Sequence, residues 1–450
     1  MAERGSTEQR IAIDLPAEVA EMVARVTDQG AEVMLVGGAV RDAFLERETT
    51  DLDFATSLRP AELGRIFPEA LGVDEKFGIC SLRTDSHDVA FVTFREEGGY
   101  SDHRHPDEVR FSDDHSVDAR RRDFTVNAIY VEPGSGRIFD PFGGVADLQD
   151  GVLRVIGNAR ERFEEDALRM LRAVRFSAGT DLALDEDALL GLREMAGLLE
   201  KLSPERMFEE LTAMFSRDGR GKALRLLVET GLAAVILPEV VELEGVEQPP
   251  RFHPEGDVLI HTCMVLDGVR PADPSQAWAA VLHDIGKPAT FERAPDRIRF
   301  SKHDVLSARM AEEVLLRLHA PSELRETVVE ICRDHIRFAS IPEMGPSKRE
   351  RWMRSPRFEQ HLEFHRADCM GSHGLLDIYH FAREAYESLP AMPPPPLCTG
   401  KDVIELGVAE GPVVGEILRC VQSQLDDCEN PGRSMALALL HEAAQPHIKH

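Results

Sequence analysis

The stretch Val33-Met34-Leu35-Val36-Gly37-Gly38-Ala39-Val40-Arg41-Asp42 decides how the N-terminal part of this chain folds. Its first four residues are apolar and predict a buried strand over 33–36, and the two glycines that follow let the backbone come close to a bound anion. A second strand is predicted to begin at Asp51-Leu52-Asp53. Because strand side chains alternate, both aspartates point to the same face of that strand.

These residues have the chemistry of a site for a metal-bound triphosphate. Gly37 and Gly38 allow close approach of the backbone, and Arg41 is a cation that pairs well with phosphate. Carboxylate oxygens, as in Asp51 and Asp53, are the hard ligands that Mg²⁺ prefers. We predict that the aspartates hold Mg²⁺ and that the glycines and the arginine bind phosphate groups. The simpler alternative is a Gly-Gly turn before an ordinary strand.

The composition indicates a large protein with reduced thiols. The chain has 450 residues, of which 43% are hydrophobic, enough for roughly three or four domains. No apolar run is long enough to cross a membrane, and the N-terminus does not resemble a signal peptide. Seven cysteines are scattered without a Cys-x-x-Cys pair, as in reduced cytosolic proteins. We therefore expect a cytoplasmic protein with no membrane partner.

The charge distribution favours a defined nucleic-acid partner over a loose one. A net charge of −28 argues against sequence-independent coating of nucleic acid. Local arginines can still hold a specific partner. Arg120-Arg121-Arg122 forms one such group, and six arginines lie from Arg154 to Arg175.

Three further motifs follow the aspartate pair. They are Arg121-Arg122-Asp123-Phe124-Thr125-Val126-Asn127-Ala128, Asp140-Pro141-Phe142-Gly143-Gly144, and a run from Arg162 to Phe176 that contains Glu165-Asp166. Together with the glycine turn, these motifs resemble the bacterial-type (class II) tRNA nucleotidyltransferase and poly(A) polymerase family over about residues 30–240. The resemblance implies template-independent nucleotidyl transfer with tRNA, CTP and ATP as partners.

The resemblance also implies roles for individual residues. It makes Asp51 and Asp53 catalytic, as ligands of two Mg²⁺ ions that activate a 3′-hydroxyl and stabilise the pyrophosphate leaving group. It implies that Arg122 adds positive charge at the triphosphate, and that Asp123 and Asn127 lie near the sugar.

The run over 162–176 is predicted to select the base. In a continuous helix, Asp166 and Arg169 share one face. Their acceptor and donor groups can meet the Watson–Crick edge of cytosine or adenine, whereas uracil and guanine place a carbonyl against Asp166. The resemblance implies that this surface replaces a nucleic-acid template, and that Arg172 and Arg175 also contact the nucleotide. The alternative is an ordinary ion pair on a helix surface.

A flexible loop is expected between the catalytic strand and the arginine motif, over residues 93–106, with Gly98-Gly99 as its hinge. In the family a loop at this place supports the switch to adding A, so its presence favours addition of the terminal A. The chain departs from the family at Ala90, where a glutamate is frequent. Asp88, two residues earlier on the same strand face, is the candidate replacement.

A second set of motifs lies in a histidine-rich helical region and centres on Ala279-Ala280-Val281-Leu282-His283-Asp284-Ile285-Gly286-Lys287. It resembles the HD phosphohydrolase superfamily, an all-helical metal-binding fold. The resemblance implies a divalent transition metal, with a second metal completing a binuclear site. The implied chemistry is hydrolysis of a phosphoester at a tRNA end, and whether the domain turns over stays open. The implied ligands are His261, His283, Asp284, Asp368, His303 and His335.

We predict an α+β protein, with a small mixed-sheet nucleotidyltransferase head followed by all-helical neck, HD and tail domains. The segment His253-Pro254-Glu255-Gly256 is interpreted as part of a domain boundary, and Pro393 to Pro396 as a stiff linker. The predicted domains are the head over 1–150, the neck with the nucleotide-selecting helix over 151–245, the HD domain over 246–390 and the tail over 391–450.

The sequence favours addition of CCA, or only its terminal A, to tRNA 3′ ends. Two alternatives stay open, a poly(A) polymerase and an HD phosphohydrolase with an RNA-binding head. The acidic composition and the HD motifs favour the tRNA enzyme over the polymerase. The presence of both Asp51 and Asp53 argues against an inactive head. The oligomeric state is not indicated.

Overall fold

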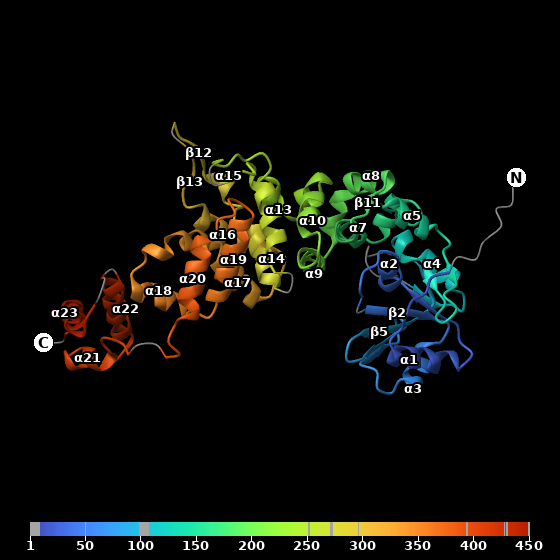
Figure 1. Cartoon of the computed structure of the whole chain (residues 1–450), viewed down its shortest axis with the longest axis horizontal. Helices are drawn as coiled ribbons and strands as arrows, with labels where there is room; N and C mark the ends of the chain where they lie inside the picture. Colours follow the sequence, from blue (N-terminus) through green and yellow to red (C-terminus); the bar gives the residue numbers. More distant parts are fainter. Residues whose placement is uncertain are drawn as a thin grey trace. The chain divides into compact units, whose positions relative to one another are not determined.

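The protein forms two compact units, one containing the residues up to Val241 together with 317–320, and one containing 242–316 and 321–450 (Figure 1). No helix among the residues with described positions is both long and apolar enough to span a membrane. The computed structural model describes residues 10–448 except for 50, 99–107, 251–252, 271–272, 296, 393–394, 427 and 429–430.

A seven-stranded mixed sheet with the order β3-β4-β5-β2-β1-β8-β9 forms the centre of the head. The strand predicted at 33–36 is present, and it pairs antiparallel with β2, which in turn pairs parallel with β5. The strands are β1 (Val33–Val36), β2 (Asp51–Thr56), β3 (Gly72–Asp74), β4 (Ile79–Arg83), β5 (Asp88–Thr93), β8 (Tyr130–Val131) and β9 (Ile138–Phe139).

Helices and a stack of aromatic rings complete the head. Phe54 and Phe67 both stack on Phe91, with centroids 5.2 and 5.1 Å away. A separate hairpin of β6 (Arg95–Gly98) and β7 (Glu108–Phe111) overlaps the segment predicted as a flexible loop over 93–106, because β6 lies within it. Residues 99–106 of that segment lie outside the described part. The helices are α1 (Ala17–Thr27), α2 (Gly38–Phe44), α3 (Pro60–Ile66), α4 (His115–Arg120), η1 (Thr125–Asn127) and α5 (Gly144–Asp150).

The neck is helical apart from a short parallel pair, β10 (Val152–Leu153) with β11 (Ala183–Leu184). Among its buried residues are Phe163, Leu171 and Phe215. Its helices are α6 (Ala159–Glu165), α7 (Leu168–Thr180), α8 (Glu186–Met195), η2 (Ala196–Lys201), α9 (Pro204–Phe215), α10 (Arg220–Glu229), α11 (Leu232–Ile236) and α12 (Pro238–Val241).

The prediction of one continuous helix over 162–176 is wrong. Helix α6 ends at Glu165, and Asp166 has extended backbone angles (φ −142°, ψ 105°) before α7 begins at Leu168. The physical reason is a side-chain cap, because Asp166 Oδ1 accepts a hydrogen bond from the Leu168 N–H at 3.1 Å. Aspartate favours such a position over a helix interior. Asp166 and Arg169 are therefore not residues of one helical face.

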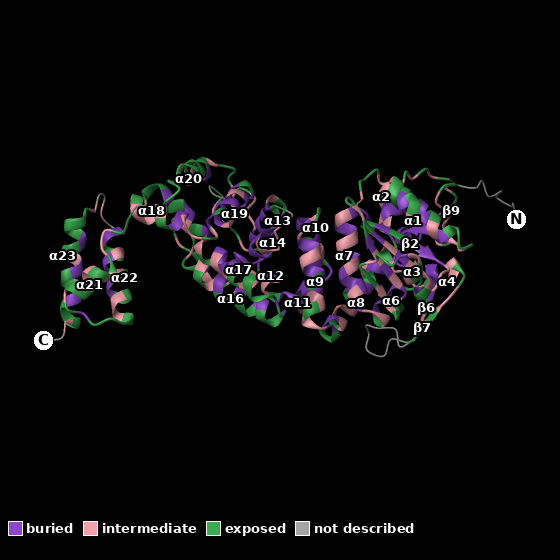
Figure 2. Cartoon of the chain, turned by 90° about the horizontal axis from the view of Figure 1, so that it is seen from below, coloured by how far each residue is buried: buried purple, intermediate pink, exposed green. Residues whose placement is uncertain are grey.

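The second unit contains the HD helices, of which α14 is buried along almost its whole length (Figure 2). An exposed two-stranded hairpin, β12 (Phe291–Arg293) with β13 (Ile298–Phe300), interrupts the helices. The helices are α13 (Val258–Gly268), α14 (Pro274–Leu282), α15 (Lys287–Thr290), α16 (His303–Arg317), α17 (Ser322–Asp334), η3 (His335–Glu343), α18 (Pro346–Met353), α19 (Phe358–Met370) and α20 (Asp377–Glu387).

The last helices of the chain share a small apolar core of their own, which includes Val403, Val421 and Leu440. Two residues of the predicted proline linker, 393 and 394, lie outside the described part. The helices are α21 (Gly400–Glu405), α22 (Pro412–Asp426), α23 (Arg433–Ala444) and η4 (Gln445–His447).

A substitution at Gly144, the first residue of α5, tests how closely the head packs around η1. A Cβ atom at Gly144 would collide with the backbone carbonyl of Thr125, which cannot move as a flexible side chain can. We expect Gly144→Ala to destabilise the protein by about 1–3 kcal/mol through overpacking. Gly197→Ala is the control, since nothing lies within 4 Å of its Cβ position. Urea unfolding followed by circular dichroism should show a lower midpoint for Gly144→Ala, and an unchanged midpoint would contradict this packing.

Candidate active site and metal centre

Three segments of the head meet at Gly37. The strand register places Val36 opposite Asp53, so the glycine turn that follows β1 lies beside the aspartate strand. A Cβ atom on Gly37 would lie 3.6 Å from Asp53 Oδ2 and 3.7 Å from a terminal nitrogen of Arg122. The φ of Gly37 is +79°, in the left-handed region that glycine adopts without strain. The turn, a carboxylate and a guanidinium thus surround one small volume.

The aspartate pair lies on one face of β2, as predicted. Asp51 and Asp53 are exposed, whereas Leu52 and Phe54 between and after them are buried. Desolvation by the surrounding protein raises the pKa of Asp53, and the charge of Arg122 opposes this shift. A bound cation would further favour the ionised carboxylate.

The candidate third carboxylate has another partner. In the parallel register of β2 and β5, Asp88 lies opposite Asp51, and Ala90 lies opposite Asp53. Asp88 forms an ion pair with Arg83, with 2.5 Å between the nitrogen and the oxygen. Its role as a replacement for the family's glutamate stays a prediction.

Two residues that the sequence did not single out hold Arg122 in place. Its Nε donates to the Tyr130 hydroxyl at 2.8 Å, and a terminal nitrogen lies 3.2 Å from Asp118 Oδ2. Tyr130 in turn donates to Asp118 at 2.6 Å, and Asp118 is fully buried. Burial alone would raise the pKa of Asp118, but the charges of Arg121 and Arg122 lower it to about 2. Arg122 is therefore oriented by a buried, ionised carboxylate.

Four predicted nucleotide-binding residues form one hydrogen-bonded chain between the head and the neck. Arg41 donates to the side-chain oxygen of Asn127 at 3.0 Å, and Asn127 donates to Asp123 at 3.2 Å. Arg172 on α7 donates to Asp123 Oδ2 at 2.9 Å through Nε and at 2.5 Å through a terminal nitrogen. Residues as far apart in sequence as Arg41 and Arg172 are thus tied into a single polar network.

The remaining predicted base-contacting residues have protein partners. Arg169 donates to Glu165 at 2.6 Å rather than to Asp166, and Arg175 donates to Glu210 at 2.5 Å. A terminal nitrogen of Arg206 lies 3.7 Å from Asp166 Oδ1. Guanidinium groups of Arg41, Arg172 and Arg175 lie 4.4–5.2 Å from the centroid of the Phe176 ring. Sequence reasoning missed Phe176, Glu210 and Arg206.

In the second unit, all six predicted metal ligands line one cavity of roughly 250 Å³. The Nε2 atoms of His261 and His283 lie 3.3 Å apart, and those of His303 and His335 lie 3.2 Å apart. Asp284 lies between the two pairs, 3.1 Å from His283 Nε2 and 3.4 Å from His303 Nε2. Asp368 contacts His261 Nε2 at 3.2 Å.

The other nitrogen of each histidine is engaged with the backbone, which fixes the ring. The Nδ1 atoms lie within hydrogen-bond distance of the carbonyls of Gly371, Ala280, Phe300 and Cys332, at 3.2, 2.9, 2.9 and 2.7 Å. A proton on each Nδ1 leaves a lone pair on each Nε2. Neither buried oxygen of Asp284 accepts a well-directed hydrogen bond, although both lie close to these nitrogens. This donor set fits divalent metal ions, whose ligands are neutral imidazole and carboxylate.

Sequence reasoning missed the residues that surround these ligands. Lys287 Nζ lies 2.7 Å from Asp284 Oδ2 and donates to Gln248 at 2.6 Å. Glu255 Oε1 lies 3.1 Å from His261 Nδ1 and 2.9 Å from His253 Nδ1. The segment interpreted as a domain boundary therefore supplies two side chains beside the predicted metal site.

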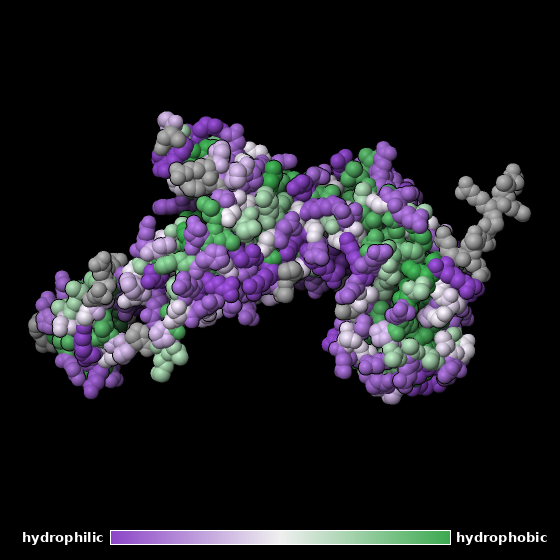
Figure 3. All heavy atoms as spheres, in the orientation of Figure 1, coloured by the Kyte–Doolittle hydropathy of each residue, from purple (hydrophilic) through white to green (hydrophobic). Residues whose placement is uncertain are grey.

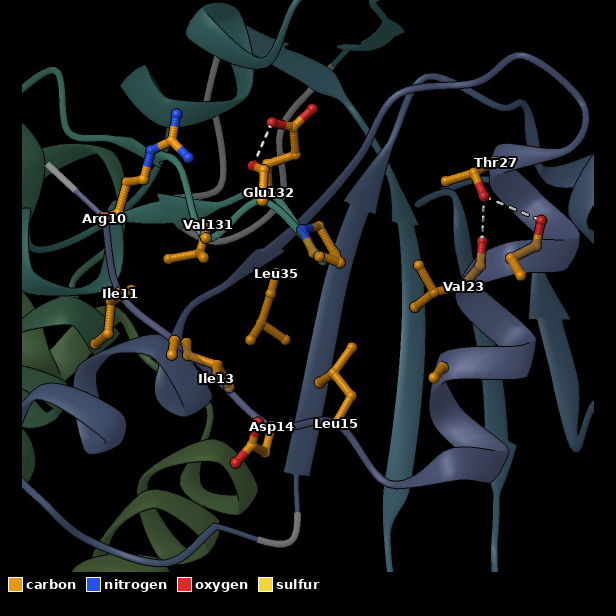
Figure 4. A pocket seen from close by; sticks show the side chains of 17 residues that line it. Arg10, Ile11, Ile13, Asp14, Leu15, Val23, Thr27, Leu35, Val131 and Glu132 are labelled. Atoms are coloured by element: carbon orange, nitrogen blue, oxygen red, sulfur yellow. Dashed lines mark hydrogen bonds between the residues drawn. The ribbon is translucent and has the colours of Figure 1, made fainter. Parts of the chain in front are cut away.

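A second cavity, in the head, contains none of the predicted site residues. It has a volume of roughly 630 Å³ and lies between the segment Arg10–Leu15, α1 and β1. Ile11, Ile13 and Leu35 point into it (Figure 4). Neither the aspartate pair, Gly37 nor Arg122 lines it, so it is distinct from the volume around Gly37.

Three family models match the chain in order. The Poly A polymerase head domain matches residues 33–154, the probable RNA and SrmB-binding site of polymerase A matches 181–243, and the HD domain matches 258–366. Domains of the first and third types are generally metal-dependent.

Curated relatives and a solved structure extend this match. A CCA-adding enzyme of Lactobacillus johnsonii is 32% identical over 66% of this chain and 71% of its own length. The multifunctional CCA protein of Xanthomonas campestris pv. campestris is 36% identical over 70% of this chain and 77% of its own. The Bacillus stearothermophilus CCA-adding enzyme, solved in complex with CTP, matches with a TM-score of 0.70 and 26% identity over 95% of this chain and 97% of its own. This chain belongs to the CCA-adding enzyme family, the bacterial class II tRNA nucleotidyltransferases.

Proposed function

We propose that this protein adds CCA, or its terminal A, to tRNA 3′ ends from CTP and ATP without a nucleic-acid template. The observation that carries the proposal is the meeting of Gly37, Asp53 and Arg122 around one volume. A glycine turn, a metal-binding carboxylate and a fixed guanidinium are what transfer from a nucleoside triphosphate requires. Relatives named CCA-adding enzymes, one of them solved with CTP, support the choice of substrates. None of the seven cysteines, all of them in the described part of the chain, forms a disulfide, which supports a cytoplasmic location.

The residues of the head divide the reaction between them. Asp51 and Asp53 would hold Mg²⁺, which when bound activates the attacking hydroxyl and neutralises charge on the leaving pyrophosphate. Arg122, held rigid by Asp118 and Tyr130, meets the triphosphate without losing further freedom on binding. The Gly37–Gly38 turn brings the backbone to the phosphates.

Sugar and base binding is proposed for the network that joins the head to the neck. Asp123 and Asn127 are the proposed sugar-binding residues, and Arg41 and Arg172 hold their side chains. Asp166 and Arg169 are the proposed readers of the base edge, and Arg175 supports them through Phe176. Arg169 exchanges its Glu165 partner for the base in this scheme. Because Asp166 is a helix cap rather than an interior helical residue, it reaches the base from a junction between two helices.

For the second unit we propose metal-dependent hydrolysis of phosphoesters at tRNA ends. His261, His283, Asp284 and Asp368 would hold one divalent transition metal, and His303 and His335 would join Asp284 at a second. A bound metal supplies an activated water at neutral pH. The side-chain nitrogen of Lys287 lies beside the site, 2.7 Å from Asp284 Oδ2, where it would attract the anionic ester. A 2′,3′-cyclic phosphate or a 2′-phosphate is the proposed substrate class.

Transcripts of tRNA that end before CCA, after C and after CC test the first proposal. Each is incubated with Mg²⁺ and CTP, ATP or both, and products are resolved at single-nucleotide length. Addition of three nucleotides and no more establishes CCA addition. Extension of the CC-ended transcript alone establishes A addition. A long A ladder would instead assign a poly(A) polymerase, the function that the head-domain match also allows.

Asp53→Asn should abolish incorporation in this assay while leaving the fold intact. The amide keeps the size of the side chain but removes the charge that would hold Mg²⁺. We expect a loss of at least about a thousandfold in rate, since metal positioning and charge neutralisation are lost together. Asp150→Asn, at an exposed position, is the matched control. Retained incorporation would remove Asp53 from the mechanism.

Asp284→Ala should separate the two units functionally. We expect it to lose bound transition metal, measured per chain by plasma mass spectrometry, and to lose hydrolysis of a 2′,3′-cyclic phosphate. Nucleotide incorporation should be unchanged. His380→Ala, an exposed histidine on α20, is the control. Loss of both activities in a folded variant would show that the units do not act independently.

Asp118→Asn should weaken the head in a pH-dependent way. The pKa of Asp118 is about 2 in the folded protein against an ordinary value of 3.8, so the ionised form stabilises the fold. This contribution, about 2 kcal/mol, is present in full above about pH 5 and is lost as the pH falls through 4 towards 2. Urea unfolding at several pH values should show a difference from the native chain that shrinks below pH 4. A difference independent of pH would contradict an ionised Asp118.

A further inference from the structure

The hairpin of β12 and β13 lies in the chain between two groups of proposed metal ligands, Asp284 before it and His303 after it. It forms a two-stranded sheet of its own and stands out from the helices next to α15 (Figure 1). All three residues of β12 are exposed. An isolated two-stranded hairpin gains little stability in water, so its aromatic residues call for another explanation.

The register of the hairpin gathers aromatic residues on one face. Phe291 lies opposite Phe300, and their rings meet edge to face with centroids 5.8 Å apart. Arg293 and Ile298 form the next pair on the same face, because side chains alternate along each strand. Glu292 lies opposite Arg299 on the other face. One face is thus aromatic and the other is polar.

This aromatic face continues into the proposed metal site. Phe300 lines the same cavity as His303 and Asp284, and Lys287 Nζ lies 5.3 Å from the centroid of its ring. Phe291, the outer ring, is 38% exposed. The two rings form a path from the buried ligands to the surface.

The size of the cavity limits what it can enclose. Its volume is roughly 250 Å³, whereas sites that enclose a whole drug-sized ligand measure about 300–1,000 Å³. A terminal phosphate and its sugar fit such a space, but a nucleotide chain must continue outside it. At the mouth of the cavity, this nucleotide chain would meet the aromatic face of the hairpin.

The charge around the hairpin suits a polyanion. From 291 to 302 the sequence has four cations (Arg293, Arg297, Arg299 and Lys302) against two carboxylates, in a chain of net charge −28. Arg293 pairs with Glu247, but both side chains are 62% exposed, so water and salt screen this contact. Hydrophilic residues surround the hairpin in the space-filling view (Figure 3).

We propose that Phe291 is a stacking platform for a base of a single-stranded RNA 3′ end whose terminal phosphate enters the HD cavity. Stacking on an aromatic side chain does not depend on base identity and strengthens binding by roughly five- to a hundredfold per base. Arg293 and Lys302 flank the path of the backbone. The inference rests on the hydrolytic function proposed for the second unit and names how that site recognises its substrate.

Kinetics on matched substrates test this platform with the full, metal-loaded protein. The substrates are a short single-stranded RNA ending in a 2′,3′-cyclic phosphate and versions in which one nucleotide at a time is abasic. We expect Phe291→Ala to raise the KM for the intact RNA roughly tenfold. Removing the stacked base should raise the KM of the native chain by a similar factor and leave that of Phe291→Ala unchanged. Phe381→Ala is the control, because Phe381 is also 38% exposed and lies on α20.

A fluorescence measurement gives a second readout that does not require turnover. In Phe291→Trp, the new indole should be quenched by the intact RNA and not by the version that lacks the stacked base, whereas Phe381→Trp should not respond. Quenching without hydrolysis would leave the platform in place and contradict the hydrolytic function. Absence of quenching, or equal KM values for the native chain and Phe291→Ala, would overturn the platform itself.

Discussion

The antiparallel register of β1 and β2 is the constraint on which the candidate active site depends. It sets Val36 opposite Asp53, and the chain leaves β1 at the next residue, Gly37. A shift of one residue would turn both aspartates into the apolar core and bring Leu52 and Phe54 to the surface. The burial of those two side chains therefore fixes the position of the carboxylates more firmly than any interaction that the carboxylates themselves make.

Buried ion pairs then extend this local order across the head and into the neck. Asp118 holds Arg122 in place, and Asp123 joins Arg172 of α7, through Asn127, to Arg41 of α2. Removing one partner of a buried pair leaves an uncompensated charge, which costs more than the pair contributes. Such a network favours a single arrangement of its members, and a site that discriminates between two nucleotides needs that rigidity.

Local patterns in the sequence were enough to predict the strand over 33–36 and the carboxylates on one face, and the family resemblance implied the mixed-sheet head. The six HD ligands, which the resemblance to the HD superfamily implied, line one cavity. The break at Asp166 could not be predicted, since the hydrogen bond that ends α6 and starts α7 leaves no trace in the apolar spacing. Asp118, Tyr130 and Glu255 were missed because their importance comes from burial and from partners far away in the sequence.

The facing histidine nitrogens of the second unit have a consequence for the lifetime of the protein. The four histidines and two carboxylates predicted as ligands line one cavity there. With the proposed metals in place, the free energy of binding adds to that of unfolding for the helices that supply the ligands. Metal availability in the cell would then govern how fast the chain is degraded as well as how fast it works. Scarcity would remove the protein rather than merely silence one of its reactions.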